Sequence, residues 1–223
     1  MVFDFFRSPG HSALEEVEAQ LVEMLRDGHT VYVTAMEALF GGGKSKEAKK
    51  EVKTTDRGIN KMQKEVRRLL MVHASVNENV DLPLVLTYMS VVKDIERAGD
   101  YAKNIYDLVK YGEDFSTAPD HDELASYRDA VGQLMLDAAD VFEQRDNDAA
   151  QKLVSKADGF LDIYEDHVRM AYESDGPAAV AVSRALYYRW LKRITAHTMN
   201  LMTSLVMPVD QLDYYDEDPN DRL

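Results

Sequence analysis

Apolar residues recur at alternating steps of three and four in six long segments, and this spacing constrains the fold more than any other feature of the chain. It gathers apolar side chains on one side of an α-helix, whereas a half-buried strand would alternate residue by residue. The third segment is typical, and its stripe consists of Leu84, Tyr88, Val91, Ile95, Ala98, Ala102, Ile105 and Val109. No stretch alternates clearly as a strand would. The sequence therefore predicts an all-α protein.

The six predicted helices fall into two sets of three, separated by a loop near residues 112–120. Long helices with short connections pack as antiparallel neighbours in bundles. We therefore predict two tandem three-helix bundles, at residues 12–111 and 119–207. An acidic tail follows at 208–223, which we expect to be mobile or a docking peptide. Its acids include Asp210, Asp213, Asp216, Glu217 and Asp218.

The glycine-rich stretch GGGKS at residues 41–45 ends like a phosphate-binding loop. That loop needs a glycine where this chain has Ala38, and it needs a strand before it. Here a predicted helix precedes the glycines. We interpret the stretch as a helix C-terminal glycine cap and turn.

Composition excludes several classes of function. The chain of 223 residues has no cysteine, which rules out disulfides, thiolate metal sites and cysteine nucleophiles. Its formal net charge of −14 repels nucleic acid unless a basic patch is set apart, and we expect no such patch and no nucleic-acid partner. The apolar start lacks the basic region of a secretory signal, and no segment is long enough to span a bilayer. We expect a cytoplasmic protein.

The third segment contains DIERAGDYAKN, which puts Glu96, Asp100 and Asn104 four residues apart on one row of a helix. Apolar residues continue the row at both ends, so the acids interrupt a surface that would otherwise be buried. Asp56 and Asn60 on the second segment form a shorter row of the same kind. Carboxylate and amide oxygens converging between helices suit Mg, Mn, Fe or, less well, Zn. The alternative is a solvated face on which Arg97 or Lys103 forms ion pairs with the acids.

The histidines do not point to a redox enzyme. There are six, none has a glutamate three positions before it, and no HExxH motif is present. The Glu-x-x-His pairs of ferritin-like di-iron bundles are therefore missing. His73 and His197 lie near apolar stripes, and we interpret them as core histidines with hydrogen-bond partners.

Residues 96–105, ERAGDYAKNI, closely resemble the E-R-x-G-D-x-x-x-N-I signature of the PhoU family of phosphate-uptake regulators. The resemblance extends to two three-helix repeats and to an acid midway along the second and fifth helices. It implies a multinuclear metal site in each repeat, often of iron or zinc. The first would use Glu96, Asp100, Asn104, Asp56 and Asn60, and a second, weaker site would use Asp158, Asp162 and Asn200.

The second copy of the motif departs from the family pattern. In LKRITAHTMN, at residues 191–200, the asparagine survives as Asn200, but Lys192 and Ala196 stand where the two acids belong. A lysine ammonium could neutralise Asp158 and Asp162 without any metal. We therefore expect a divalent or ferric ion, if one is bound, to favour the first site.

The resemblance implies a regulator of phosphate uptake and phosphate-starvation signalling that acts by binding a transporter component or a sensor histidine kinase, and that self-associates. We find no nucleophile with its base and no open redox site, so we expect no enzymatic activity. Two alternatives stay open. One is a metalloenzyme or metal store with oxygen ligands, and the other is a metal-free adaptor whose acidic row only sets the charge of an interaction surface.

Overall fold

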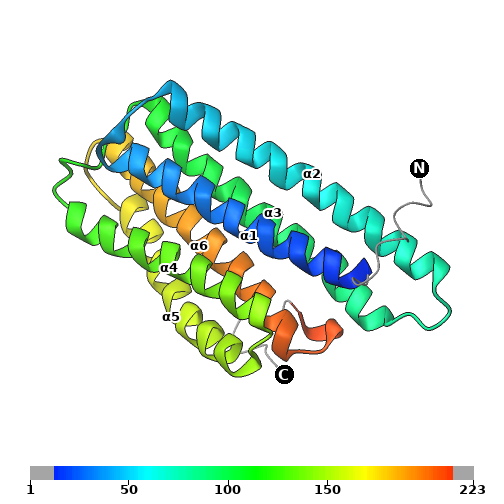
Figure 1. The fold of residues 1–223 in the computed structure, drawn as a ribbon. Helices are drawn as coiled ribbons and strands as arrows, with labels where there is room; N and C mark the ends of the chain where they lie inside the picture. The colour runs from blue at the N-terminus through cyan, green and yellow to red at the C-terminus, as the bar shows by residue number, and fades with distance from the viewer. Residues whose placement is uncertain (1–12, 213–223) are drawn as a thin grey trace.

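The computed structural model describes residues 13–212 and folds them into six long helices, with no strand in that range (Figure 1). The prediction of an all-α fold is confirmed. The helices are α1 (Ala13–Glu37), α2 (Lys46–Val76), α3 (Leu82–Tyr111), α4 (His121–Gln144), α5 (Asn147–Tyr172) and α6 (Ala178–Val206). A short π-helix, η2 (Ala38–Gly42), follows α1, and a 3-10 turn, η3 (Val209–Gln211), follows α6.

Polar side chains fix where three of the helices begin. The side chain of Ser45 accepts a hydrogen bond from the Ala48 N–H at 2.8 Å, and Asp81 does the same for the Leu84 N–H at 3.1 Å. Asp146 caps α5 in the same way. Each cap satisfies a backbone donor that has no partner inside the helix.

The glycine-rich stretch ends α1, as we interpreted it. The chain widens into η2, and the Gly43 N–H closes the turn on the Ala38 carbonyl at 2.8 Å. Gly41 has φ +130°, a conformation that only glycine adopts without strain. A helix precedes the glycines, so this is not the strand-loop-helix arrangement of a phosphate-binding loop.

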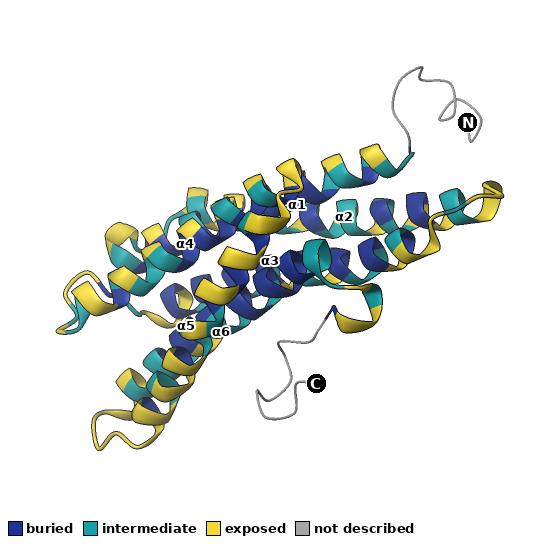
Figure 2. Cartoon of the chain, turned by 90° about the horizontal axis from the view of Figure 1, so that it is seen from below, coloured by how far each residue is buried: buried dark blue, intermediate teal, exposed yellow. Residues whose placement is uncertain are grey.

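The two sets of helices share one hydrophobic core. α3 packs along α6 and α1 along α4, while α2 and α5 lie on the outer sides (Figure 1). Buried residues follow the inner faces of the helices in both sets (Figure 2). The helices lie inside the predicted ranges 12–111 and 119–207. Residues 208–212 turn back onto α6, where Leu212 is buried and its carbonyl accepts from Thr203 Oγ1 at 2.5 Å. Residue 12 and the predicted tail from 213 to 223 lie outside the described residues.

The linker between the two sets is anchored by one aromatic residue. Phe115 is fully buried, with its ring 5.5 Å from that of Phe40 and 5.3 Å from that of Tyr187, and its N–H donates to the Leu39 carbonyl at 2.8 Å. The Arg184 guanidinium lies 4.2 Å above the Phe115 ring. The linker therefore contributes to the core and does not merely span it.

Arg184 fastens the end of the linker as well. Its Nε and Nη2 donate to the two carboxylate oxygens of Asp120 at 2.6 and 2.7 Å, the paired geometry that binds a carboxylate most strongly. These hydrogen bonds lower the pKa of Asp120, although partial burial opposes them. One side chain of α6 thus holds both the middle and the end of the linker.

Charge is unevenly distributed, because α2 carries nine Lys and Arg against four Asp and Glu, whereas the whole chain has 26 against 40. Seven of the nine recur at steps of three and four, are exposed and lie opposite the buried side of the helix. We call them the basic stripe: Lys46, Lys50, Lys53, Arg57, Lys61, Lys64 and Arg68. The expectation that the chain has no basic patch is therefore wrong.

No helix in residues 13–212 is both long and apolar enough to cross a membrane.

Candidate functional site: an acidic cluster between α2 and α3

The acidic row of the motif lies where α3 approaches α2 closely. A Cβ added at Gly99 would come within 3.1 Å of Ile59 Cδ1 on α2, closer than such atoms normally pack. The small residues Ala98 and Ala102 on the same helix are buried. These small side chains let the two backbones approach, and the approach brings the acids of α3 toward Asp56.

A lysine lies between the two carboxylates that the sequence assigned to a metal. Lys103 Nζ donates to Asp100 Oδ1 at 2.6 Å and to Asp56 Oδ1 at 2.7 Å, and all three side chains are largely shielded from water. Burial alone would lower the pKa of Lys103, but the two hydrogen bonds outweigh it and raise that pKa. The predicted proximity of Asp100 to Asp56 is confirmed, and an ammonium group bridges them.

Glu96 completes the cluster one turn before Asp100. Its side chain is 14% exposed, and Arg97 lies 3.9 Å from it and 3.8 Å from Asp100. Burial raises the pKa of Glu96, and the neighbouring Asp100 raises it further, while Arg97 opposes both. A carboxyl group in such surroundings holds its proton more tightly than a solvated glutamate.

The two amides of the predicted site lie on the same pair of helices. Asn60 donates its side-chain N–H to the Asp56 backbone carbonyl at 2.9 Å, and Asn104 is half-buried on α3. In residues 13–212 no three His, Asp or Glu side chains are placed to hold a metal ion. In this arrangement the ammonium of Lys103 lies between Asp56 and Asp100, so a metal ion would compete with it for these two carboxylates.

The residues of the predicted second site are spread over different surroundings. Asp158 is half-buried, Asp162 is exposed, and Asn200 is buried with its amide donating to Asp94 Oδ1 at 3.2 Å. Lys192 donates a hydrogen bond to Glu165, and Asp162 on the same helix is exposed. This hydrogen bond lowers the pKa of Glu165. Glu165 lies three residues beyond Asp162, nearly one helical turn further along α5.

A polar network between the two repeats was missed by sequence reasoning. Asp94 Oδ1 lies 2.8 Å from His197 Nδ1 and also accepts from Asn200, so one acid of α3 binds two side chains of α6. The His197 ring stacks on Tyr101 at 5.7 Å. The interpretation of His197 as a core histidine with a partner is confirmed. Asp94 stands two residues before Glu96, just outside the motif of residues 96–105, and its spacing gives no sign that it faces α6.

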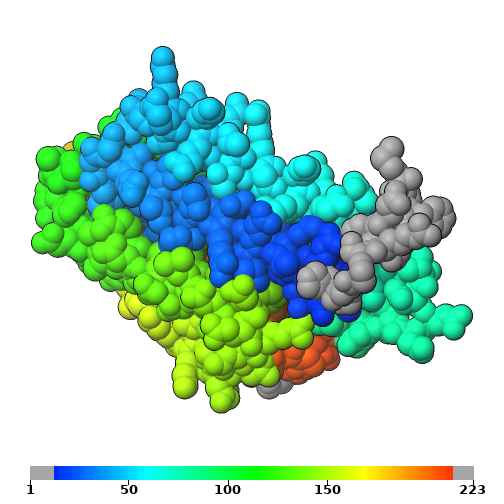
Figure 3. Space-filling view, in the orientation of Figure 1, coloured from blue at the N-terminus to red at the C-terminus, as the bar shows by residue number. Residues whose placement is uncertain are grey.

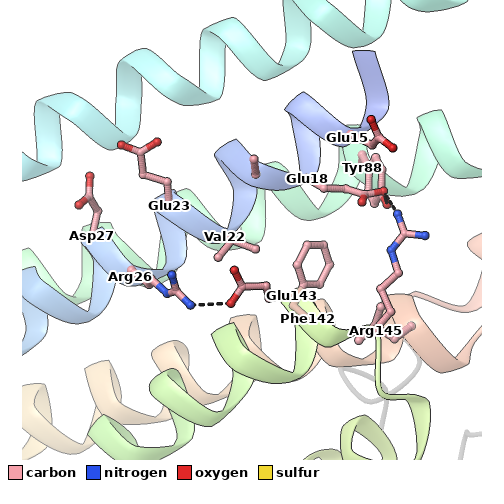
Figure 4. Close-up of a pocket in the computed structure, with 12 residues that line it drawn as sticks. Glu15, Glu18, Val22, Glu23, Arg26, Asp27, Tyr88, Phe142, Glu143 and Arg145 are labelled. Carbon is pink, nitrogen blue, oxygen red and sulfur yellow. Dashed lines mark hydrogen bonds and ion pairs between the residues drawn. The ribbon is translucent and has the colours of Figure 1, made fainter. Parts of the chain in front are cut away.

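A groove of about 420 Å³ opens between α1, the start of α3 and the ends of α4 and α6 (Figure 4). Arg26 donates to Glu143 at 2.6 Å on one side, and Arg145 and Tyr88 both donate to Glu18 on the other. Both arginines of the lining are thus already paired. The other charged residues that line the groove are acidic: Glu15, Glu23 and Asp27. Burial and then the neighbouring Glu23 raise the pKa of Asp27.

Comparisons with known proteins agree with the motif. Residues 21–109 match the family model described as the PhoU domain, a range that contains the acidic cluster. The chain is 28% identical over 204 residues to the phosphate-specific transport system accessory protein PhoU homolog of Synechocystis sp.. That alignment covers 87% of this chain and 88% of the relative.

Two solved structures have the same fold. PhoU from Pseudomonas aeruginosa superposes with a TM-score of 0.75 at 23% identity, covering 90% of this chain and 96% of that one. The phosphate transport system regulatory protein PhoU from Streptococcus pneumoniae gives a TM-score of 0.74 at 18% identity, covering 94% of this chain and 97% of the other. The resemblance to the PhoU family is therefore confirmed: residues 21–109 match the PhoU domain, and the chain has the PhoU fold.

Proposed function

We propose that this chain is a cytoplasmic accessory protein of phosphate transport, which restrains phosphate uptake and phosphate-starvation signalling by binding a transporter component, a sensor histidine kinase or both. The main support is its similarity, over 87% of its length, to a phosphate-specific transport system accessory protein. Relatives bear the names of accessory and regulatory proteins, and the proposed role includes no reaction.

The acidic groove between α1 and α4 is the surface that we propose for the partner. It combines the apolar side chains of Val22, Phe142 and Leu205 with an excess of acidic residues around them. A partner segment with basic side chains around an apolar residue complements both properties. Such complementarity acts mainly on the rate of association, which falls as salt rises.

Deletion of the gene tests the proposed role. We expect deletion to raise phosphate uptake or to alter the starvation response, and we expect the wild-type chain to restore both. The double variant E23K/D27K should fail to restore them because it reverses the charge of the groove. The control E173K/D175K makes the same change of charge at exposed positions outside the groove, and it should restore them. Deletion cells with unaltered uptake and unaltered signalling would refute the phosphate role.

The acidic cluster is tested in the same cells. Asp100→Ala removes one of the two carboxylates that Lys103 bridges, and we expect it to weaken restoration. Lys192→Ala removes the hydrogen bond to Glu165 in the other repeat, and we expect it to matter much less. Equal effects of the two substitutions would show that the cluster has no special part in regulation.

Metal binding at the cluster stays a prediction, supported by the hard oxygen ligands Asp56, Glu96 and Asp100. Because the Lys103 ammonium competes for two of these carboxylates, we expect Lys103→Met to bind divalent or ferric ions more tightly than the wild type. Asp100→Asn should abolish binding in both backgrounds. Isothermal titration with Fe, Zn, Mn and Mg salts, and metal analysis of protein purified without chelator, measure this. If Lys103→Met binds no ion, the metal prediction fails and the metal-free adaptor remains.

A further inference from the structure

The basic stripe on α2 has no role in the proposed function. Its seven Lys and Arg span residues 46–68, about 33 Å at the rise of an α-helix. Among the described residues only Arg68 of the seven forms an ion pair, with Glu65 at 2.8 Å. Within residues 13–212 α2 packs mainly on α1 and α3, so its other side is not covered by another helix of this range. In the space-filling view α2 forms one edge of the molecule (Figure 3).

Apolar side chains continue the stripe at one end. Met71 follows Arg68 by three residues, so it lies on the same side of α2, and it is 57% exposed. Val76, Leu82 and Leu86, around the turn between α2 and α3, are 60%, 50% and 48% exposed. This turn lies at the end of the molecule away from α4 and α5 (Figure 1). Exposed apolar clusters of this kind are typical of interaction sites.

More lysines gather at the opposite end of the stripe. Lys44, Lys46, Lys49 and Lys110 line a hollow of about 360 Å³ beside Ser45 and Tyr106. Lys110 also pairs with Asp107. Four ammonium groups around a hollow of this size suit a phosphate group, which can accept hydrogen bonds from several of them.

We propose that α2 is a membrane-contact surface: the basic stripe binds the phosphate headgroups of anionic phospholipids, and Met71, Val76, Leu82 and Leu86 enter the boundary between headgroups and acyl chains. A basic helix face beside exposed apolar residues is the combination that binds a protein peripherally to an anionic bilayer. The stripe lies on the solvent side of a helix that crosses no membrane, so the contact is parallel to the bilayer.

The same residues argue against a nucleic acid as the partner of the basic stripe. α2 contains no Phe, Tyr or Trp, so it lacks the large aromatic side chains on which bases stack. Five of the seven basic residues are lysines, which act as point charges and lack the paired donors with which arginine recognises a base. The exposed apolar end would gain nothing on a phosphate backbone, whereas it gains free energy at a lipid interface.

The test uses the full chain and sedimentation with vesicles of phosphatidylcholine alone, or of phosphatidylcholine and phosphatidylglycerol in equal parts. The variant K50E/R57E/K64E reverses the middle of the stripe. The control K93E/K152E/K156E makes the same change of net charge at exposed lysines elsewhere. A melting curve for each variant confirms that it is folded.

We expect the wild type and the control to bind the anionic vesicles and not the neutral ones. Loss of each basic contact weakens binding about fivefold, so the stripe variant should bind on the order of a hundredfold more weakly. M71S/L86S should lose the part of the binding that persists at high salt. The proposal is overturned if the wild type ignores anionic vesicles, if the stripe variant binds them as the wild type does, or if a DNA duplex is bound more tightly. Because the assay uses purified protein, its outcome is independent of the phosphate role.

Discussion

Replacing Phe115 by alanine should destabilise the whole molecule, although this residue lies in the linker between the repeats. Its ring is fully buried against Phe40 and Tyr187, and the Arg184 guanidinium stacks on it at 4.2 Å. Alanine leaves a cavity between α1, the linker and α6, and it removes the aromatic partner of the guanidinium.

The expected loss can be built from these contacts. Truncation of a fully buried phenylalanine costs about 3–5 kcal/mol, including the cavity that remains. The guanidinium–ring contact contributes about 0.5–2 kcal/mol when it is shielded from water. We therefore expect Phe115→Ala to lower the free energy of unfolding by roughly 4–7 kcal/mol, a large part of the total for a typical domain.

Urea denaturation followed by circular dichroism and by fluorescence of Trp190 measures the change. Phe115→Leu keeps most of the apolar volume and loses the ring, so it should lie between the wild type and the alanine variant. The control Tyr111→Ala removes an aromatic residue that is 76% exposed at the end of α3, and it should change stability by less than about 0.5 kcal/mol. A loss below about 1 kcal/mol for Phe115→Ala would show that the linker does not anchor the core.

Three further predictions concern the polar contacts. Because burial and Asp100 raise the pKa of Glu96 above the ordinary 4.5, wild-type stability should fall as pH rises from 4.5 through the folded pKa, and Glu96→Gln should remove this fall in urea titrations at several pH values. Arg184 lowers the pKa of Asp120 below 3.8, so Asp120→Asn should be less stable than the wild type at neutral pH, with a difference that disappears as pH falls from 3.8 through the folded pKa. Asp94→Ala leaves buried donors of His197 without an acceptor and should cost roughly 1–3 kcal/mol in urea denaturation, whereas Asp94→Asn, which keeps an oxygen acceptor, should cost less.

The helices were predictable because each one buries a single apolar side, and the steps of three and four record that side directly. The start of α3 was predictable for a local reason as well, since Asp81 lies three residues before Leu84 and its side chain accepts a hydrogen bond from the Leu84 N–H. The burial of Phe115 was not predictable from the sequence, because a single aromatic residue between two helical patterns does not reveal whether its side chain turns inward. Its position depends on Leu39 and Tyr187, which are distant in the sequence.

The acidic cluster was predictable in part. The four-residue spacing placed Glu96 and Asp100 on one row, but spacing along a helix does not say which cation lies between two helices. Lys103 follows Asp100 by three residues and reaches across to Asp56, a choice made by the packing of α3 on α2. Lys192 shows the same limit, because Glu165 and Asp162 are both within reach along the chain and only the packed structure selects Glu165.

The basic stripe shows what a net charge conceals. The basic residues of α2 recur at the same steps of three and four as the apolar residues, so the stripe is present in the sequence although the net charge is negative. Net charge averages over all surfaces, whereas a partner meets only one of them.

The uneven charge of the molecule also has a consequence for how it approaches a surface. A protein with a formal net charge of −14 is repelled as a whole by a negatively charged bilayer, and this repulsion is felt first. At closer range the positive edge formed by α2 and the acidic remainder experience opposite forces, which produce a torque. Screening confines this torque to about 10 Å at 0.1 M salt. The molecule would therefore be turned in the last step of its approach, so that α2 and no other helix meets the lipid.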